Sequence, residues 1–537
     1  MLSGRDSPED RLKAVEALER DGDEGLRYIM TVDVFNEGVD IRRVNQIVFL
    51  RPTESPVVFT QQLGRGLRRC GGKPYVSVVD FISNYKSNYL IPIALSGDRS
   101  YEKSQLRRWV RGGSPLTPGS STIQFSRLAR ERVLRSLDDV NLNSARILRE
   151  GLFELYRRLD RVPSLLDYLH QDVMHPGKFL ENKLGRGLSY WSWAVGEINR
   201  DRRRRGRTLL PATGFSGEEE KMLVFAGRYF GSARRPGEGV LLSAVARGEE
   251  RPLEDVLREA LEKACPEGVP AHEVDSTLAC LDGTFWKGKP DVPVLIERID
   301  GHYHPSRTWR TAVGRNPALK SALAELGAFI TAEARRRAAE RYLDTEFVLH
   351  QEYNYEEVER LLGWRTFLNG GAVGGYAYDG DSRTLPVFIN YEKLDDAVGY
   401  GDVFLSKDRL KAHSKGGRGL GSADVAKIYG RPPFEDRRLF LFVRKKTHSG
   451  SGEVQRFIFL GELDPVGAPV PETAPDGKGG SKPVFAIEYR LETPLTDELF
   501  TYFNDEGDVL VNAQSHTSTA TDEDAGNVVL ETPSTPN

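Results

Sequence analysis

Hydrophobic and polar positions follow three successive patterns along the chain. In the first pattern, short apolar runs alternate with segments of helical spacing, and Ser7 and Pro8 suit the N-cap and first position of a helix. This pattern predicts helices at residues 7–20 and 56–67, and strands at residues 28–32, 45–50 and 75–81. Because strands alternate with helices, residues 1–125 are expected to form a parallel α/β sheet.

The second pattern is mostly helical and covers residues 126–345. Apolar residues recur at helical spacing in residues 145–159, and residues 318–342 form a second strong helical segment. The run of arginines at residues 202–205 lies between these segments, and a solvated loop is the commoner interpretation of such a run than a DNA contact. This region is therefore expected to be mostly α-helical.

In the third pattern, residues 346–500, short apolar runs are bounded by Gly, Pro and Asp. Strands are expected at residues 385–391, 439–443, 457–460 and 485–491, which predicts a compact β-rich domain. Residues 501–537 are polar and poor in aromatic residues, so a disordered tail is expected there.

Composition narrows the class of protein. The 537 residues are 39% hydrophobic and 28% charged, as in ordinary globular chains, and neither a membrane span nor a signal peptide is predicted, so a cytoplasmic location is expected. The three cysteines, Cys70, Cys265 and Cys280, are too far apart for a Cys-x-x-Cys pair, and no metal site is predicted. With a net charge of −3, any nucleic-acid surface must be a local basic patch.

Two motifs in the first region carry recognisable chemistry. Residues 31–40 read Thr-Val-Asp-Val-Phe-Asn-Glu-Gly-Val-Asp, and residues 61–68 read Gln-Gln-Leu-Gly-Arg-Gly-Leu-Arg. In order and spacing they resemble the fifth and sixth motifs of superfamily 2 (DEAD/DEAH-type) helicases, and residues 1–4 look like the end of the fourth motif. The resemblance implies that residues 1–125 are the second RecA-like lobe of such a motor, truncated at its N-terminus.

The resemblance also implies roles for single residues. Arg65 and Arg68 match the arginine fingers, which supply positive charge where the γ-phosphate charge spreads in the transition state. The same resemblance places Gln61, Gly38 and Asp40 at the nucleotide, and it places Thr31 at a phosphate of the nucleic-acid backbone. The alternative is that the arginines merely form a solvated helix face.

The phosphate-cradling loop Gly-x-x-x-x-Gly-Lys-Ser/Thr and the Asp-Glu magnesium motif of such motors are not found in the sequence. ATP and Mg²⁺ are therefore expected to be held mainly by a first RecA-like lobe that this chain lacks, whether through truncation or because another polypeptide supplies it. By itself the chain is not expected to hydrolyse ATP.

Beyond the sixth motif, residues 79–86, 91–97 and 99–101, and later residues 439–444 and 457–461, resemble bacterial helicases that carry a C-terminal domain of unknown function, number 3427. That family implies a DNA partner, and some members are type IV restriction enzymes that act on methylated DNA and carry a phospholipase-D-like nuclease before the helicase. It also implies that the C-terminal domain recognises the DNA target and that residues 126–345 are a helical coupler between this domain and the motor.

Residues 346–500 contain side chains suited to that role. Lys411, Lys415 and Arg418 are expected to contact DNA phosphates. A base flipped out of a duplex stacks between aromatic rings, for which the candidates are Tyr353, Tyr355, Trp364, Tyr376, Tyr378, Tyr391 and Tyr400. The alternative is that these rings form an ordinary core. His413-Ser-Lys415 imitates a phospholipase-D signature, but Leu420 stands where that signature needs Asp.

The leading hypothesis is therefore the C-terminal part of an ATP-dependent DNA helicase or translocase of a restriction or phage-defence system. Two alternatives stay open. One is a non-enzymatic DNA-binding module with a vestigial half-motor, and the other is a fragment of an RNA helicase, although no RNA-binding module is recognisable.

Overall fold

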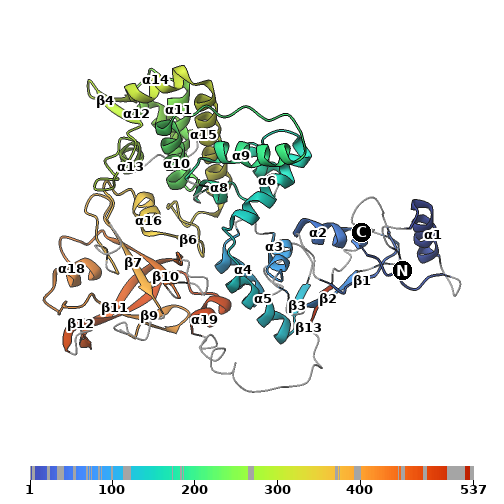
Figure 1. Cartoon of the computed structure of the whole chain (residues 1–537). Coiled ribbons are helices and arrows are strands. Elements are labelled where there is room, and N and C mark those ends of the chain that lie inside the picture. Colours follow the sequence, from blue (N-terminus) through green and yellow to red (C-terminus); the bar gives the residue numbers. More distant parts are fainter. Residues whose placement is uncertain are drawn as a thin grey trace. The chain divides into compact units, whose positions relative to one another are not determined.

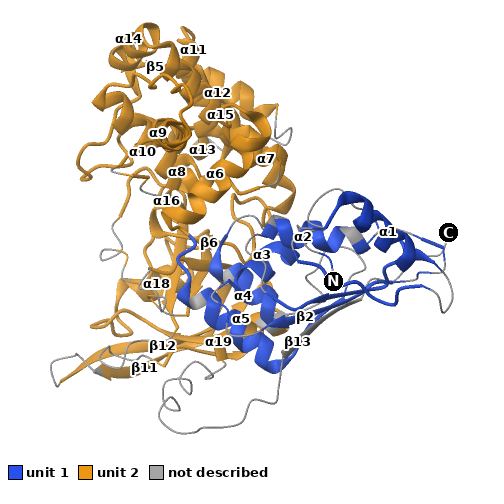
Figure 2. Ribbon diagram, turned by 45° about the vertical axis from the view of Figure 1, so that its right-hand side comes forward, with its two compact units in different colours: residues 1–142, 506–537 blue, residues 143–505 orange. Residues whose placement is uncertain are grey.

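A computed structural model shows how the chain is organised (Figure 1). It describes residues 2, 6–20, 25–32, 41–51, 56–67, 70, 71, 73, 75–82, 85, 87–97, 101–112, 122–171, 173–181, 184, 185, 187–263, 271–368, 373, 375–391, 401–445, 447, 448, 454–475, 480–504 and 526–531. Two compact units are present: residues 1–142 with 506–537, and residues 143–505 (Figure 2).

The first unit contains a four-stranded sheet in the order β1-β2-β13-β3. Strands β1 (Gln46–Phe49) and β2 (Ser77–Ile82) pair in parallel, as predicted. Strand β13 (Gly526–Glu531) runs antiparallel to both β2 and β3 (Thr122–Phe125), so the sheet is mixed rather than parallel throughout. β13 also lies within the segment that was predicted to be disordered. The prediction was wrong at these residues because a short strand can be completed by partners far away in sequence.

Helices α1 (Pro8–Glu19), α2 (Pro56–Gly66), α3 (Leu90–Ser96), α4 (Lys103–Gly112) and α5 (Arg127–Asp139) belong to this unit. The predicted N-cap is confirmed, since the Ser7 side chain accepts a hydrogen bond from the Asp10 backbone N–H at 3.1 Å. The strand predicted at residues 28–32 is reduced to one isolated bridge, which joins Thr31 to Leu2.

The second unit begins with a helical region. Its helices are α6 (Ala145–Leu159), α7 (Leu165–Gln171), α8 (Gly177–Glu181), α9 (Tyr190–Arg204), α10 (Gly217–Phe230), α11 (Pro236–Arg247), α12 (Leu253–Glu262), α13 (Ala271–Leu281), α14 (Arg307–Arg315) and α15 (Pro317–Arg337), with a hairpin of β4 (Ile296–Ile299) and β5 (His302–Pro305). Helices α11 and α15 cross at Gly239 and Gly327, where a Cβ on Gly239 would lie 2.7 Å from the Gly327 carbonyl oxygen. None of the helices in the described residues could cross a membrane.

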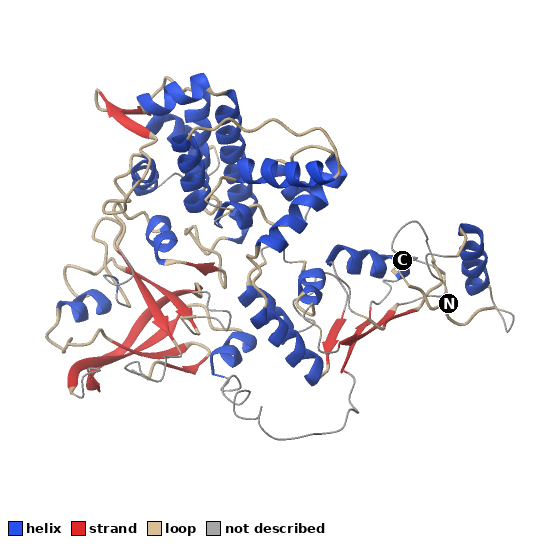
Figure 3. Ribbon diagram, viewed as in Figure 1, coloured by secondary structure: helices blue, strands red, loops and turns tan. Residues whose placement is uncertain are grey.

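A curled sheet follows, in the order β7-β10-β11-β12-β9-β8, with β6 paired to β11 (Figure 3). Its strands are β6 (Glu352–Tyr353), β7 (Thr384–Asn390), β8 (Val403–Ser406), β9 (Arg409–His413), β10 (Arg438–Arg444), β11 (Phe457–Pro475) and β12 (Ser481–Leu491), accompanied by α16 (Tyr355–Leu361), α18 (Ala423–Tyr429) and α19 (Asp497–Asn504). The sheet packs its apolar residues into one core that includes Leu385, Leu441, Ile458 and Phe485. The β-rich domain was therefore predicted correctly as a class.

A buried ionic cluster joins the helical region to α16. Glu238 of α11 accepts hydrogen bonds from Arg235 at 2.6 Å and from Arg360 of α16 at 2.5 Å, and all three side chains are at most 2% exposed. Burial raises the pKa of Glu238, but the two guanidinium groups outweigh that effect and lower it to about 2. The carboxylate is thus the shared counter-charge of two buried arginines.

Candidate functional site

Helix α2, which carries residues 61–66 of the sixth motif, packs one face against β1. Phe59 and Leu63 are buried, and the Phe59 ring lies 5.0 Å from the ring of Phe49. One turn after Leu63, a Cβ on Gly66 would lie 2.7 Å from the Cδ1 atom of Ile47. This inner face therefore fixes how the helix sits on the sheet, because Gly66 leaves little room for any larger residue.

The opposite face of α2 carries the motif residues that the sequence assigns to the nucleotide. Gln61 and Gly64 are exposed, and Arg65 follows Gln61 by one helical turn. The side chain of Arg65 lies outside the described part of the chain. The same is true of the whole of residues Arg68, Gly38 and Asp40. Thr31 is exposed, and its neighbours Met30 and Val32 bond the backbone of Leu2. Gln61 and Thr31 are thus accessible, as contacts to a ligand require.

Gly64 occupies an unusual place on this face. In the part of the chain that is described, nothing lies within 4 Å of the position that its Cβ would take. Glycine inside a helix costs about 1 kcal/mol relative to alanine. Packing among the described residues gives no reason for that cost, so the bare backbone at Gly64 is available for the close approach of another group.

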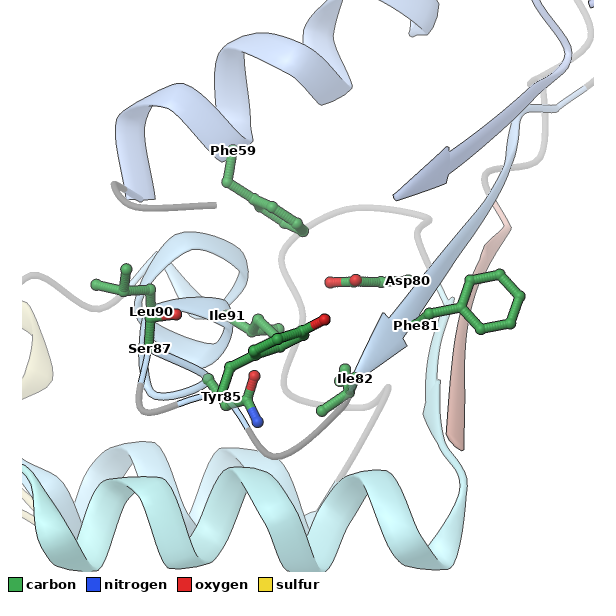
Figure 4. A pocket seen from close by; sticks show the side chains of 9 residues that line it. Phe59, Asp80, Phe81, Ile82, Tyr85, Ser87, Leu90 and Ile91 are labelled. Atoms are coloured by element: carbon green, nitrogen blue, oxygen red, sulfur yellow. The ribbon is translucent and has the colours of Figure 1, made fainter. Parts of the chain in front are cut away.

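A pocket that sequence reasoning missed lies beneath α2. It is lined by Phe59, Asp80, Phe81, Ile82, Tyr85, Ser87, Asn88, Leu90 and Ile91, and Figure 4 shows the Asp80 carboxyl directed toward the space between Phe59 and Tyr85. On β2, Asp80 shares its face with Val78 and Ile82, each 2% exposed, and is itself only 8% exposed. The available signal was a single carboxylate within an apolar strand.

The chemistry of Asp80 follows from that burial. Desolvation raises the pKa of its carboxyl to about 7, and no described group forms a hydrogen bond with it. Near neutral pH the group therefore interconverts between a hydrogen-bond donor and a buried anion. Because it lies on the strand behind α2, its charge state bears on the element that carries the sixth motif.

In the β-rich region, two of the three predicted phosphate-binding cations are already paired. Lys411 forms an ion pair with Glu472 at 3.0 Å, and Arg418 with Asp424 at 3.2 Å. Lys415 packs its ammonium 4.8 Å from the centre of the Tyr376 ring, and burial, together with the charges of Arg418 and Lys427, lowers its pKa. Lys411 links β9 to β11, whereas Lys415 and Arg418 fix the loop after β9 against Tyr376 and Asp424. Less positive charge is therefore available for a phosphate than the sequence implied.

His413 is part of the same network. Its Nδ1 lies 3.0 Å from Asp402 and its Nε2 lies 2.9 Å from Glu472, and these carboxylates raise the pKa of the imidazole. The ring therefore ties β9 to β11 and to the segment before β8. The structure thus gives His413 a structural partner on each ring nitrogen.

Of the seven aromatic residues proposed to stack on a base, three are buried in the fold. Tyr353, Trp364 and Tyr376 are between 0% and 6% exposed, and the Trp364 indole donates to the Thr384 hydroxyl at 2.8 Å. These three belong to the core, as the alternative interpretation held. Tyr355, Tyr378 and Tyr391 are partly buried, and Tyr400 lies outside the described residues.

Comparisons with known proteins match three separate parts of the chain. Residues 1–70 match the helicase conserved C-terminal domain, residues 148–336 match the domain of unknown function DUF8090, and residues 347–503 match the domain of unknown function DUF3427. Together, the first and last matches support a superfamily 2 helicase with a C-terminal DUF3427 domain.

Two curated relatives each match a short stretch of this chain. A putative ATP-dependent RNA helicase of Methanocaldococcus jannaschii is 44% identical over 64 residues, which is 12% of this chain and 8% of that protein. A putative ATP-dependent helicase of Saccharomyces cerevisiae is 33% identical over 72 residues, which is 13% of this chain and 10% of that protein. The similarity therefore covers a small part of each relative's length.

Proposed function

We propose that this chain is the C-terminal part of an ATP-dependent DNA helicase or translocase, with residues 1–125 as its second RecA-like lobe. The observation that carries the proposal is the sixth motif on α2, whose inner face packs on β1 while Gln61 and Gly64 remain open. An exposed glutamine, a bare backbone position and an arginine one turn later make a surface suited to a triphosphate.

In this proposal, Arg65 and Arg68 are the arginine fingers, and Gln61, Gly38 and Asp40 contact the same nucleotide. A guanidinium group stabilises the charge that spreads over the γ-phosphate in the transition state. The phosphates and Mg²⁺ are held mainly by a first RecA-like lobe, because the 537 residues contain no Gly-x-x-x-x-Gly-Lys-Ser/Thr loop. The chain thus supplies half of a composite ATP site.

Thr31 would hold the DNA backbone, and residues 346–500 would recognise the DNA target in a restriction or phage-defence system, with methylated duplex as one candidate. If Lys411 and Arg418 contact phosphates, those phosphates must compete with Glu472 and Asp424. Lys415 is the better candidate of the three, since its ammonium lies over the Tyr376 ring whereas Lys411 and Arg418 form ion pairs with carboxylates.

An RNA substrate is the second candidate function, because the M. jannaschii relative is named as an RNA helicase. The DNA and RNA hypotheses are distinguished by ATPase assays. The assays use a first RecA-like lobe with and without this chain, in the presence of DNA or RNA. The proposal predicts little ATPase from either part alone and DNA-stimulated hydrolysis from both together. Stimulation by RNA but not DNA would favour the second candidate, whereas DNA binding without any gain in hydrolysis would favour a non-enzymatic module.

A further inference from the structure

Arginines gather at one end of two helices in the helical region. Two contacts show that helices α6 and α9 run in the same direction (Figure 1). Arg149 of α6 forms an ion pair with Glu197 of α9 at 3.3 Å. Further along both helices, Tyr156 of α6 accepts a hydrogen bond from Arg202 of α9 at 2.7 Å. Their C-terminal ends therefore lie together. We call the seven arginines at this end the arginine tip: Arg157, Arg158, Arg202, Arg203, Arg204, Arg205 and Arg207.

The backbone of the tip is held in place by its own hydrogen bonds. Arg202 donates from Nε to the Thr208 carbonyl at 2.6 Å, and the Arg207 N–H donates to the Arg202 carbonyl at 2.8 Å. Further along the loop, Asn199 exchanges two hydrogen bonds with the backbone of Leu210, at 2.9 and 2.7 Å. The tip is therefore pre-organised, so binding a ligand there costs little ordering of the backbone.

Much of the charge on the tip is not neutralised. Arg158 pairs with Glu154 at 2.7 Å and Arg205 with Asp201 at 2.9 Å, and Asp160 is a further carboxylate at the end of α6. Within the described chain, Arg157, Arg203, Arg204 and Arg207 have no ion-pair partner, and all four are exposed. Seven arginines against three carboxylates leave a strong positive excess in a protein whose net charge is −3.

The stability of α9 does not account for this excess. Cations near a helix C-terminus are favoured by about 0.3–1 kcal/mol, and the effect fades beyond the last turn. Arg203 and Arg204 fall within that turn, but Arg207 lies beyond the helix end. Arg202 already satisfies the local backbone and Tyr156. The remaining guanidinium groups are therefore available for an external anion.

We propose that the arginine tip binds the phosphodiester backbone of nucleic acid, as a contact site separate from both the motor lobe and the β-rich domain. The proposal rests on the proposed function in that nucleic acid is the partner. Guanidinium forks match phosphate oxygens, and interfaces with nucleic acid are strongly positive, whereas the cores of protein interfaces are depleted in charge. Such a site would hold duplex DNA without reading its sequence.

The test measures the salt dependence of DNA binding by the full chain, without ATP, using fluorescence anisotropy of a labelled 20-base-pair duplex. The variant R203Q/R204Q/R207Q removes three exposed charges. Each lost phosphate contact lowers the slope of log affinity against log salt by about 0.9, and three contacts lower it by about 2.7. The fall in affinity between about 50 and about 200 mM salt should then be about 40-fold smaller than for the unaltered chain.

Matched variants separate this effect from general charge loss. R251Q/R258Q/K263Q also removes three exposed charges from the helical region, but these cations already pair with Glu259 and Asp255, so the slope should not change. R203K/R204K/R207K keeps the charge and should keep the slope. Comparing the thermal unfolding of all variants excludes loss of folding as the cause.

Equal slopes for the unaltered chain and R203Q/R204Q/R207Q would overturn the proposal, as would an unaltered chain that binds no duplex at all. The proposal would also be overturned if R203Q/R204Q/R207Q lost binding to labelled poly-glutamate while its slope for DNA stayed unchanged. That result would identify an acidic protein as the partner. Since ATP is absent, failure of the arginine-finger assignment would leave these slopes as they are.

Discussion

Replacing Asp80 by asparagine tests the interpretation of the buried carboxyl beneath α2. Asparagine has nearly the same shape but does not ionise. In the folded chain burial raises the pKa of Asp80 from 3.8 to about 7, so the folded state binds the proton more tightly than the unfolded state does. The contribution of Asp80 to the stability of the first unit is therefore most favourable below about pH 4, falls as the pH rises to about 7, and is level above that.

The size of the effect follows from the shift. About three pH units at about 1.4 kcal/mol each give a cost of about 4 kcal/mol above pH 7, as an order of magnitude. Asp80→Asn should remove that cost. The variant is expected to be more stable than the unaltered unit near pH 8, with an advantage that shrinks steadily to nothing near pH 4.

The local stability of β2 and α2 is measured by hydrogen exchange of their peptides, corrected for the intrinsic effect of pH on exchange. A local measurement is needed because the chain has two units and global unfolding would mix their contributions. Asp139→Asn, at the exposed end of α5, is the matched control and should not change the pH dependence. If the protection of β2 in Asp80→Asn differs from that of the unaltered chain by a constant amount at every pH, Asp80 is not the titrating group and the reasoning is refuted.

Two further predictions concern packing. Gly66→Leu should destabilise the first unit by about 1–3 kcal/mol, because the new side chain clashes with Ile47. Gly64→Ala places its methyl group in open space and should leave the stability unchanged or raise it by up to about 1 kcal/mol. Hydrogen-exchange protection of α2 measures both effects, and equal effects would contradict the assignment of the two helix faces. Glu238→Gln should cost about 3–5 kcal/mol in denaturant unfolding of the second unit, because it leaves Arg235 and Arg360 buried without a counter-charge. Glu218→Gln, which loses an exposed pair with Lys221, should cost under about 1 kcal/mol, and similar losses for both glutamates would contradict the account.

The sequence predicted elements well where the signal is local. Residues 145–159 form α6 over exactly the expected span, and Ser7 caps α1, because helical spacing and a capping side chain act within a few residues. Residues 28–32 failed as a strand because a strand is stabilised by its pairing, and here the pairing is one bridge to Leu2.

Strand β11 shows a different limit. The predicted strand at residues 457–460 continues to Pro475, through residues that ordinarily argue against a strand. Pro471 and Pro475 pair with Phe485 and Ser481 of β12, and their positions have the same parity. Phe485 makes its backbone hydrogen bonds to Ser414, on the β9 side, so the Pro471–Phe485 pair is a non-hydrogen-bonded one. The missing N–H groups of both prolines therefore fall on the edge away from β12, where no bond to that strand is lost. A sequence does not reveal which edge a proline faces until the partner strand is known.

The candidate sites divide in the same way. Residues 61–66 of the sixth motif lie on α2, where the helical pattern placed them, because both signals are local; Arg68 lies outside the described residues. The pairing of Lys411 with Glu472 joins two distant strands, and the burial of Asp80 depends on α2 and α3, so neither could be read from spacing. The arginine run at residues 202–205 was visible, but its neighbours on α6 were not.

The central claim is that Arg65 and Arg68 complete an ATP site whose phosphates are held by another lobe. The most direct measurement is the DNA-stimulated ATPase rate of this chain combined with a first RecA-like lobe, for Arg65→Ala, Arg68→Ala and the exposed control Arg130→Ala. The account predicts a loss of about 10³-fold or more for each of the first two, with unchanged DNA binding, and no loss for the control. Rates within a few-fold of the unaltered chain for both finger variants would contradict it.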